Sequence, residues 1–133
     1  MTHSQVTSIQ LRQIGFLFLA FGQVTDNQLD ATEMRVIADR LQTWLAPDVV
    51  IDFLREVIDE YRTFETEDER RMQASEYAHM LHESLSELQQ KRVLRDVILI
   101  GKADGRVSDG ELGFVAALKS IFGIAGGDLE LHH

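Results

Sequence analysis

The chain has 133 residues but no cysteine, a single proline and two tyrosines. Without cysteine, disulfides, thiolate metal sites and cysteine-based redox chemistry are excluded, and the compartment cannot be inferred from cysteine usage. We therefore take the cytoplasm as the default expectation. Proline is rare and no long run alternates between polar and apolar residues, so nothing indicates a sheet. The sequence predicts an all-α fold.

Basic residues are also scarce, because 13 Lys and Arg stand against 22 Asp and Glu, for a formal net charge of -9. Such a surface repels phosphate backbones and anionic lipid, so nucleic acid is not an expected partner. The most apolar stretch, residues 14–21, is far shorter than the ~20 residues of a membrane-spanning helix, and we expect no membrane insertion. A single domain over residues 1–133 can bury about two thirds of the surface of its unfolded chain.

Apolar residues recur at helical spacing and predict a compact bundle of about six helices. The first is apolar nearly all round and is expected at the centre of the core. Pro47 disfavours helix at the residue before it and suits the first turn of the third helix. Thr66 with Glu69, and Ser86 with Gln89, have the spacing of a capping box at a helix start. The first three expected helices run over about 5–22, from after Asp30 to before Pro47, and over about 47–64. The fourth follows a charged turn at 65–71 and extends to about 85, and the fifth runs over about 87–103. The sixth begins after Ser108 and ends near 122, where Gly123 suits a helix-closing position.

The two ends of the chain align with each other without a gap, so that Asp26 falls on Asp104 and Glu33 on Glu111. In each half an apolar helix is followed by an Asp at a turn and a Glu inside the next helix. We therefore predict a pseudo-two-fold internal repeat within one domain. Its parts are two repeat halves at about 5–46 and 87–123, a helical insert at 47–86, and a tail at 129–133 whose His pair looks like the start of an expression tag.

Helix capping explains part of this acidic pattern. Asp30 with Glu33, and Ser108 with Glu111, have capping-box spacing, in which two side chains satisfy free amides at a helix start. Such caps need no ligand. Capping does not, however, explain Asp26 and Asp104, the two aligned aspartates at the turns.

A metal site is the alternative explanation. If the two halves bring their loops together, the carboxylates pool in one region and repel one another. A hard divalent cation such as Ca²⁺ or Mg²⁺ takes oxygen ligands and would relieve that repulsion. The second loop is not an EF-hand, since it is too short and has Arg106 at its third position. The candidate ligands are Asp26, Asp30, Glu33, Asp104, Asp109 and Glu111.

Residues 103–112, Ala-Asp-Gly-Arg-Val-Ser-Asp-Gly-Glu-Leu, follow an apolar helix and resemble the signature of the TerB-like tellurite-resistance family. The resemblance implies an all-helical fold with internal two-fold symmetry and a bacterial stress-response setting. It also implies a metal site shared by acidic residues of both halves, with Ca²⁺ favoured over Mg²⁺. It supplies no catalytic reaction. The first half departs from the family pattern, with Asn27 in place of the glycine and Asp30 in place of the serine.

A second constellation lies in the fourth expected helix, where Glu76 and His79 have the Glu-x-x-His spacing of di-metal carboxylate bundles. Such bundles need two copies of this motif, and the chain has one. Helical phase places His79 on the solvent side. The buried face is expected to contain Tyr77, Met80, Leu81, Leu85 and Leu88.

Two hypotheses of function from different classes follow. The first is a stress-response protein that binds a divalent cation through its paired acidic loops. The second is a metal-independent interaction module that acts through an apolar surface, by homodimerisation through the Phe-rich first helix or by binding an unknown protein, with the acidic motifs only as caps. We do not expect an enzyme, because the sequence has no nucleophile–base pair and no phosphate-binding glycine loop after a strand.

Overall fold

The computed structural model describes the backbone of residues 6–26, 31–102 and 109–124, and the side chains of residues 6–21, 34–100 and 112–124. These ranges form helices and contain no strand, which confirms the predicted all-helical class. None of their helices has the length and apolar character needed to cross a bilayer. The helices are α1 (Ser8–Asp26), α2 (Ala31–Leu41), α3 (Pro47–Arg62), α4 (Glu67–Ser84), α5 (Glu87–Lys102) and α6 (Asp109–Phe122).

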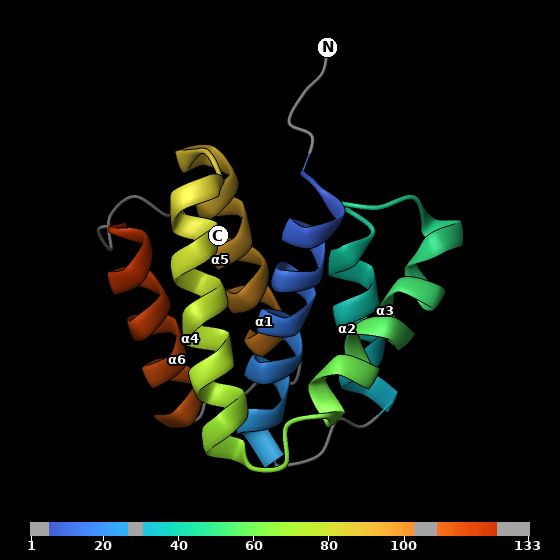
Figure 1. Ribbon diagram of the computed structural model, residues 1–133, viewed down its shortest axis with the longest axis horizontal. Coiled ribbons are helices and arrows are strands. Elements are labelled where there is room, and N and C mark those ends of the chain that lie inside the picture. Colours follow the sequence, from blue (N-terminus) through green and yellow to red (C-terminus); the bar gives the residue numbers. More distant parts are fainter. Residues whose placement is uncertain (1–5, 27–30, 103–108, 125–133) are drawn as a thin grey trace.

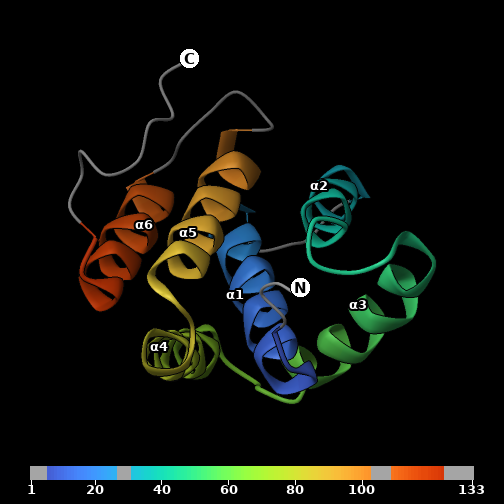
Figure 2. The ribbon, with the colours of Figure 1, turned by 90° about the horizontal axis from the view of Figure 1, so that it is seen from above.

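Helix α1 lies at the centre of the bundle and packs against each of the other five helices. Successive helices run in alternating directions (Figure 1). Seen from above, α5 and α6 lie on one side of α1, and α2 and α3 lie on the other (Figure 2). As a result, the ends of α1 and α5 lie at the same end of the bundle as the starts of α2 and α6. The internal repeat and the domain boundaries remain predictions.

The core is built around α1, in which every side chain from Gln13 to Phe21 is buried. Phe16, Phe18 and Phe21 are at most 1% exposed. Burying one such side chain stabilises the fold by roughly 1.5–3 kcal/mol. Because these phenylalanines are buried in the core of the domain, a surface that binds a second copy or another protein must consist of other residues.

Two capping boxes predicted from the sequence are confirmed. At the start of α4, Oγ1 of Thr66 accepts a hydrogen bond of 3.1 Å from the Glu69 amide, and Oε1 of Glu69 accepts one of 3.3 Å from the Thr66 amide. At the start of α5, Ser86 and Gln89 exchange the corresponding bonds of 3.1 and 2.9 Å. Each box satisfies two amides that lack a partner within the helix.

Helix α1 both begins and ends later than predicted. Oγ1 of Thr7 accepts a bond of 3.1 Å from the Gln10 amide, while the Gln10 side chain accepts one of 2.8 Å from the Thr7 amide, so the helix begins at Ser8. It then continues past Gly22 to Asp26, since no proline interrupts it. At the other end of the chain, Gly123 follows α6 with a φ of +68°, as predicted.

Three apolar side chains that helical periodicity places on an inward face are instead exposed. They are Ile51 of α3 at 56%, Met80 of α4 at 51% and Leu88 of α5 at 78%. Leu88 lies in the first turn of α5, and this turn is at one end of the bundle (Figure 1). Helical periodicity identifies the apolar face of a helix but not where its neighbours stop. The prediction was therefore wrong at these three positions.

Candidate functional site

The structure describes the backbone of four of the six predicted acidic residues, and all four lie at helix ends. Asp26 is the last residue of α1, and Glu33 lies in the first turn of α2. Asp109 and Glu111 lie in the first turn of α6. Their side chains lie outside the described residues, as do Asp30 and Asp104 altogether. The backbone therefore locates four of the six candidates, and the metal site stays a prediction.

The three helix ends that carry these residues, namely the end of α1 and the starts of α2 and α6, lie at one end of the bundle (Figure 1). A direct contact joins two of the helices concerned. The rings of Phe21, near the end of α1, and Phe114, near the start of α6, have centroids 5.2 Å apart at an interplanar angle of 71°. This edge-to-face packing holds the end of α1 beside the start of α6.

The capping explanation for Glu33 and Glu111 gains support from other helix starts. Ser/Thr-x-x-Glu/Gln spacing gives a capping box at Thr66 and at Ser86. Thr7 begins α1 in the same way, and sequence reasoning missed this box although its Thr7-x-x-Gln10 spacing is readable. The two acidic boxes themselves lie outside the described residues.

The Glu-x-x-His motif of α4 does not gather metal ligands. His79 is exposed, as predicted. His82 is engaged elsewhere, because its Nδ1 lies 2.8 Å from Oε1 of Gln90. Across the described part of the chain, no three His, Asp or Glu side chains are grouped so that they could hold a metal ion.

A buried carboxylate that sequence reasoning missed lies between α2 and α5. Asp96 is 3% exposed and accepts a hydrogen bond of 2.9 Å from Nε1 of Trp44. NH1 of Arg40 lies 3.5 Å from its Oδ1. Burial raises the pKa of Asp96, and the bond from Trp44 and the nearby arginines oppose this rise. The readable signal was a carboxylate between Val93 and Val97 on the apolar face of the helix.

Arg92 extends this cluster by lying over the indole ring of Trp44, with its guanidinium carbon 3.9 Å from the ring centroid. Burial lowers the pKa of the Arg92 guanidinium. Trp44 was predicted within the second helix, but α2 ends at Leu41 and Trp44 lies in the turn that follows. The cluster thus connects the turn after α2 to α5, and so joins the α1–α2 hairpin to the α5–α6 hairpin.

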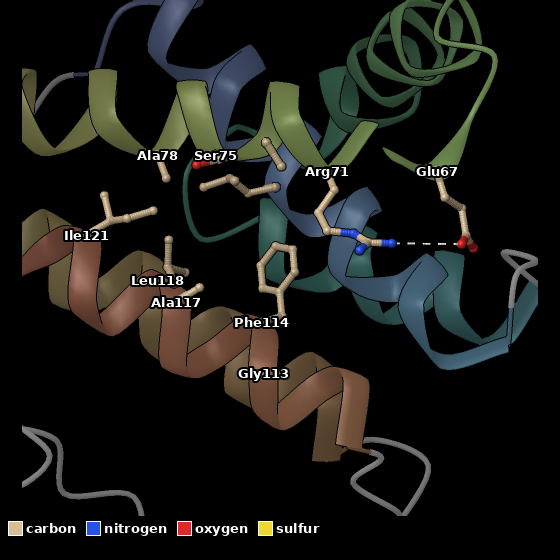
Figure 3. Close-up of a pocket in the computed structure, with 11 residues that line it drawn as sticks. Glu67, Arg71, Ser75, Ala78, Gly113, Phe114, Ala117, Leu118 and Ile121 are labelled. Atoms are coloured by element: carbon tan, nitrogen blue, oxygen red, sulfur yellow. Dashed lines mark ion pairs between the residues drawn. The ribbon is translucent and has the colours of Figure 1, made fainter. Parts of the chain in front are cut away.

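An open groove of about 450 Å³ lies between α4 and α6 (Figure 3). The buried Leu17 of α1 also lines it. Its volume is in the range of small-molecule sites. Helices α4 and α6 run in the same direction along it. The other lining residues are Glu67, Arg71, Ala74, Ser75 and Ala78 from α4, and Gly113, Phe114, Ala117, Leu118 and Ile121 from α6.

Comparison with known proteins gives one finding. A family model described as tellurite resistance protein TerB matches residues 23–132. Neither a search of curated proteins nor a search of solved structures found a significant match. The match extends over α2 to α6 and thus over most of the bundle, including both acidic segments. The chain therefore belongs to the TerB tellurite resistance family.

Proposed function

We propose that the protein binds a divalent cation, Ca²⁺ in preference to Mg²⁺, at the end of the bundle where its acidic helix ends lie. The observation that carries this proposal is the shared location of the end of α1 and the starts of α2 and α6 (Figure 1). Asp26, Glu33, Asp109 and Glu111 belong to those ends. In the sequence Asp30 directly precedes α2 and Asp104 lies two residues after the end of α5, and these two residues complete the proposed set.

The chemistry of these donors fits a hard cation. All six are carboxylates, and the chain has no cysteine. Ca²⁺ accepts six to eight oxygen ligands in flexible geometry, whereas Mg²⁺ requires a near-ideal octahedron and retains several waters. Ligands contributed by several helix ends and two loops suit the more tolerant ion. The net charge of -9 further favours uptake of a cation over an anion.

Binding at this end would act on the relative position of the two helical hairpins, α1–α2 and α5–α6. Trp44 and Asp96 join these hairpins along their length, and Phe21 with Phe114 joins them near the acidic end. A cation shared by both would add a third connection. We infer that the family's association with tellurite resistance involves a domain whose stability responds to metal.

Thermal unfolding of tag-free protein tests the proposal, first in EDTA and then with added Ca²⁺, Mg²⁺ or Mn²⁺. The test variant is Asp26→Asn with Asp104→Asn. The matched control is Asp39→Asn with Asp59→Asn, which removes two exposed carboxylates from α2 and α3. We expect a saturable rise in the midpoint with Ca²⁺ for the parent and the control, and none for the test variant. A ligand at a hundred times its Kd stabilises the native state by about 2.7 kcal/mol.

The opposite result would favour the metal-independent interaction module. If no ion shifts the midpoint at millimolar concentration, and the test variant is as stable as the parent or more so, then the acidic residues act as caps and solvated charges. If the control variant lost the rise in midpoint to the same extent as the test variant, the effect would come from the overall negative charge and not from the acidic helix ends. Titration calorimetry of the EDTA-treated protein would then measure the number of ions bound.

A further inference from the structure

The groove between α4 and α6 changes character along its length (Figure 3). Glu67 and Arg71 lie at one end, where both helices begin, and Phe114 lies across from Arg71. The hydroxyl-bearing Ser75 follows. The other end is apolar, and it is lined by Ala78, Leu118 and Ile121. A polar head and an apolar floor thus lie in line, separated by roughly 10 Å of helix at 1.5 Å per residue.

We propose that this groove binds a single-chain amphiphile with a carboxylate head, in which the head contacts Arg71 and the alkyl chain lies between α4 and α6. None of the residues that line this groove is among the six acidic residues of the proposed metal site, and the proposal does not depend on that site. Ligand sites in proteins typically combine mostly apolar walls with a few polar groups that orient the ligand. The groove has this composition.

Arg71 is suited to receive the head because its present partners hold it weakly. Its NH2 lies 3.7 Å from Oδ1 of Asp68 and 4.0 Å from Oε1 of Glu67, and its side chain is 62% exposed. Ion pairs of this length and exposure contribute little to stability. Within the described residues these are its polar contacts. A carboxylate in the groove could therefore form the shorter, bidentate pair that arginine favours.

The apolar half is suited to an alkyl chain because small side chains keep it open. Ala74 and Ala78 form one wall, and Gly113 and Ala117 form the other. A Cβ built on Gly113 meets no other atom within 4 Å. Leu17, which is 1% exposed, also lines the groove. The open side admits one chain from solvent, and each methylene that it buries strengthens binding.

The first test measures binding of sodium decanoate below its micellar concentration, by calorimetry and by NMR of ¹³C-methyl-alanine protein. We expect saturable binding with shifts at the methyl groups of Ala74, Ala78 and Ala117, and none at Ala46. Affinity should rise about two- to fourfold per methylene from hexanoate to decanoate. Equal binding of decanol or decyltrimethylammonium would overturn the role of Arg71. Binding only to anionic vesicles, with none to monomeric decanoate, would overturn the free amphiphile as occupant.

Two pairs of variants locate the site. Ala117→Phe fills the groove and should abolish decanoate binding, whereas Ala116→Phe, at an exposed neighbouring position outside the lining, should not. Arg71→Gln should weaken decanoate about tenfold and leave decanol unchanged. Its control is Arg55→Gln, which breaks a comparable exposed pair of 3.8 Å with Asp52. Retained binding in Ala117→Phe, or equal loss in both members of either pair, would overturn the proposal.

Discussion

The indole Nε1 of Trp44 donates a hydrogen bond of 2.9 Å to Oδ2 of Asp96, and this bond joins the turn after α2 to the middle of α5. Arg40 and Arg92 add positive charge around the same carboxylate. A buried carboxylate is tolerated only when such partners replace the water it has lost. The turn after α2 is therefore connected to α5 by a polar contact with a buried carboxylate.

Asp96→Ala should destabilise the protein by about 2–3 kcal/mol, because it leaves the Trp44 indole N–H and neighbouring guanidinium groups without their shared acceptor. Asp96→Asn should cost less, since its carbonyl still accepts from the indole. Chemical denaturation at neutral pH measures both values. Asp59→Ala, at an exposed site, should stay within about 0.5 kcal/mol of the parent. Equal effects of Ala and Asn at Asp96 would contradict the assigned hydrogen bond.

The hydroxyl groups of Tyr61 and Tyr77 should ionise at a higher pH than an ordinary tyrosine. Burial raises the pKa of Tyr61 to about 12, and burial together with the hydrogen bond to Glu60 raises the pKa of Tyr77 to about 12. Both folded pKa values lie above the ordinary tyrosine value of 10.0. The stability that the protonated tyrosines contribute is therefore present below pH 10 and is lost as pH rises from 10 to 12. Tyrosinate absorbance of the folded protein should therefore be small at pH 10.

Glu60→Gln provides the control for this titration. It should lower the pKa of Tyr77, because the charged acceptor is removed, and leave that of Tyr61 raised. One tyrosine should then ionise before the other. If both tyrosines of the parent protein ionise near pH 10 while circular dichroism shows an intact fold, that result would contradict the burial of their hydroxyl groups.

Two glycines, one inside α6 and one directly after it, should respond in opposite ways to substitution by alanine. Gly123 has a φ of +68°, so Gly123→Ala should destabilise the protein by about 1 kcal/mol. Gly113 lies inside α6 with open space around its Cβ direction, so Gly113→Ala should stabilise by up to about 1 kcal/mol. Thermal unfolding of the two single variants measures the difference. The same sign for both would show that α6 ends elsewhere.

Thr66→Ala should cost about 1 kcal/mol, because the Glu69 amide loses its acceptor at the start of α4. Ser75→Ala, in the interior of the same helix, is the matched control and should be close to neutral. Urea denaturation resolves a difference of this size. A neutral Thr66→Ala would mean that water replaces the cap without loss, which would also weaken the capping explanation for the acidic motifs.

Much of the fold could be predicted because its signals are local. Capping spacing located the starts of α4 and α5, and Pro47 located the start of α3. The family signature at residues 103–112 led to the correct family. The candidate acidic residues were also readable as a set, since carboxylates at repeated positions are visible without a structure. Which of them bind an ion, if any, depends on side-chain positions that spacing does not determine.

The sequence by itself determined the helical class, most helix starts and the central place of α1, since propensity, capping and apolar periodicity act between residues close in the chain. Only the tertiary structure decided that Asp96 pairs with Trp44, that Met80 and Leu88 are exposed, and that α4 and α6 leave a groove between them. Each of these depends on how far apart two helices lie and where each one stops, which is a property of packing between segments distant in sequence.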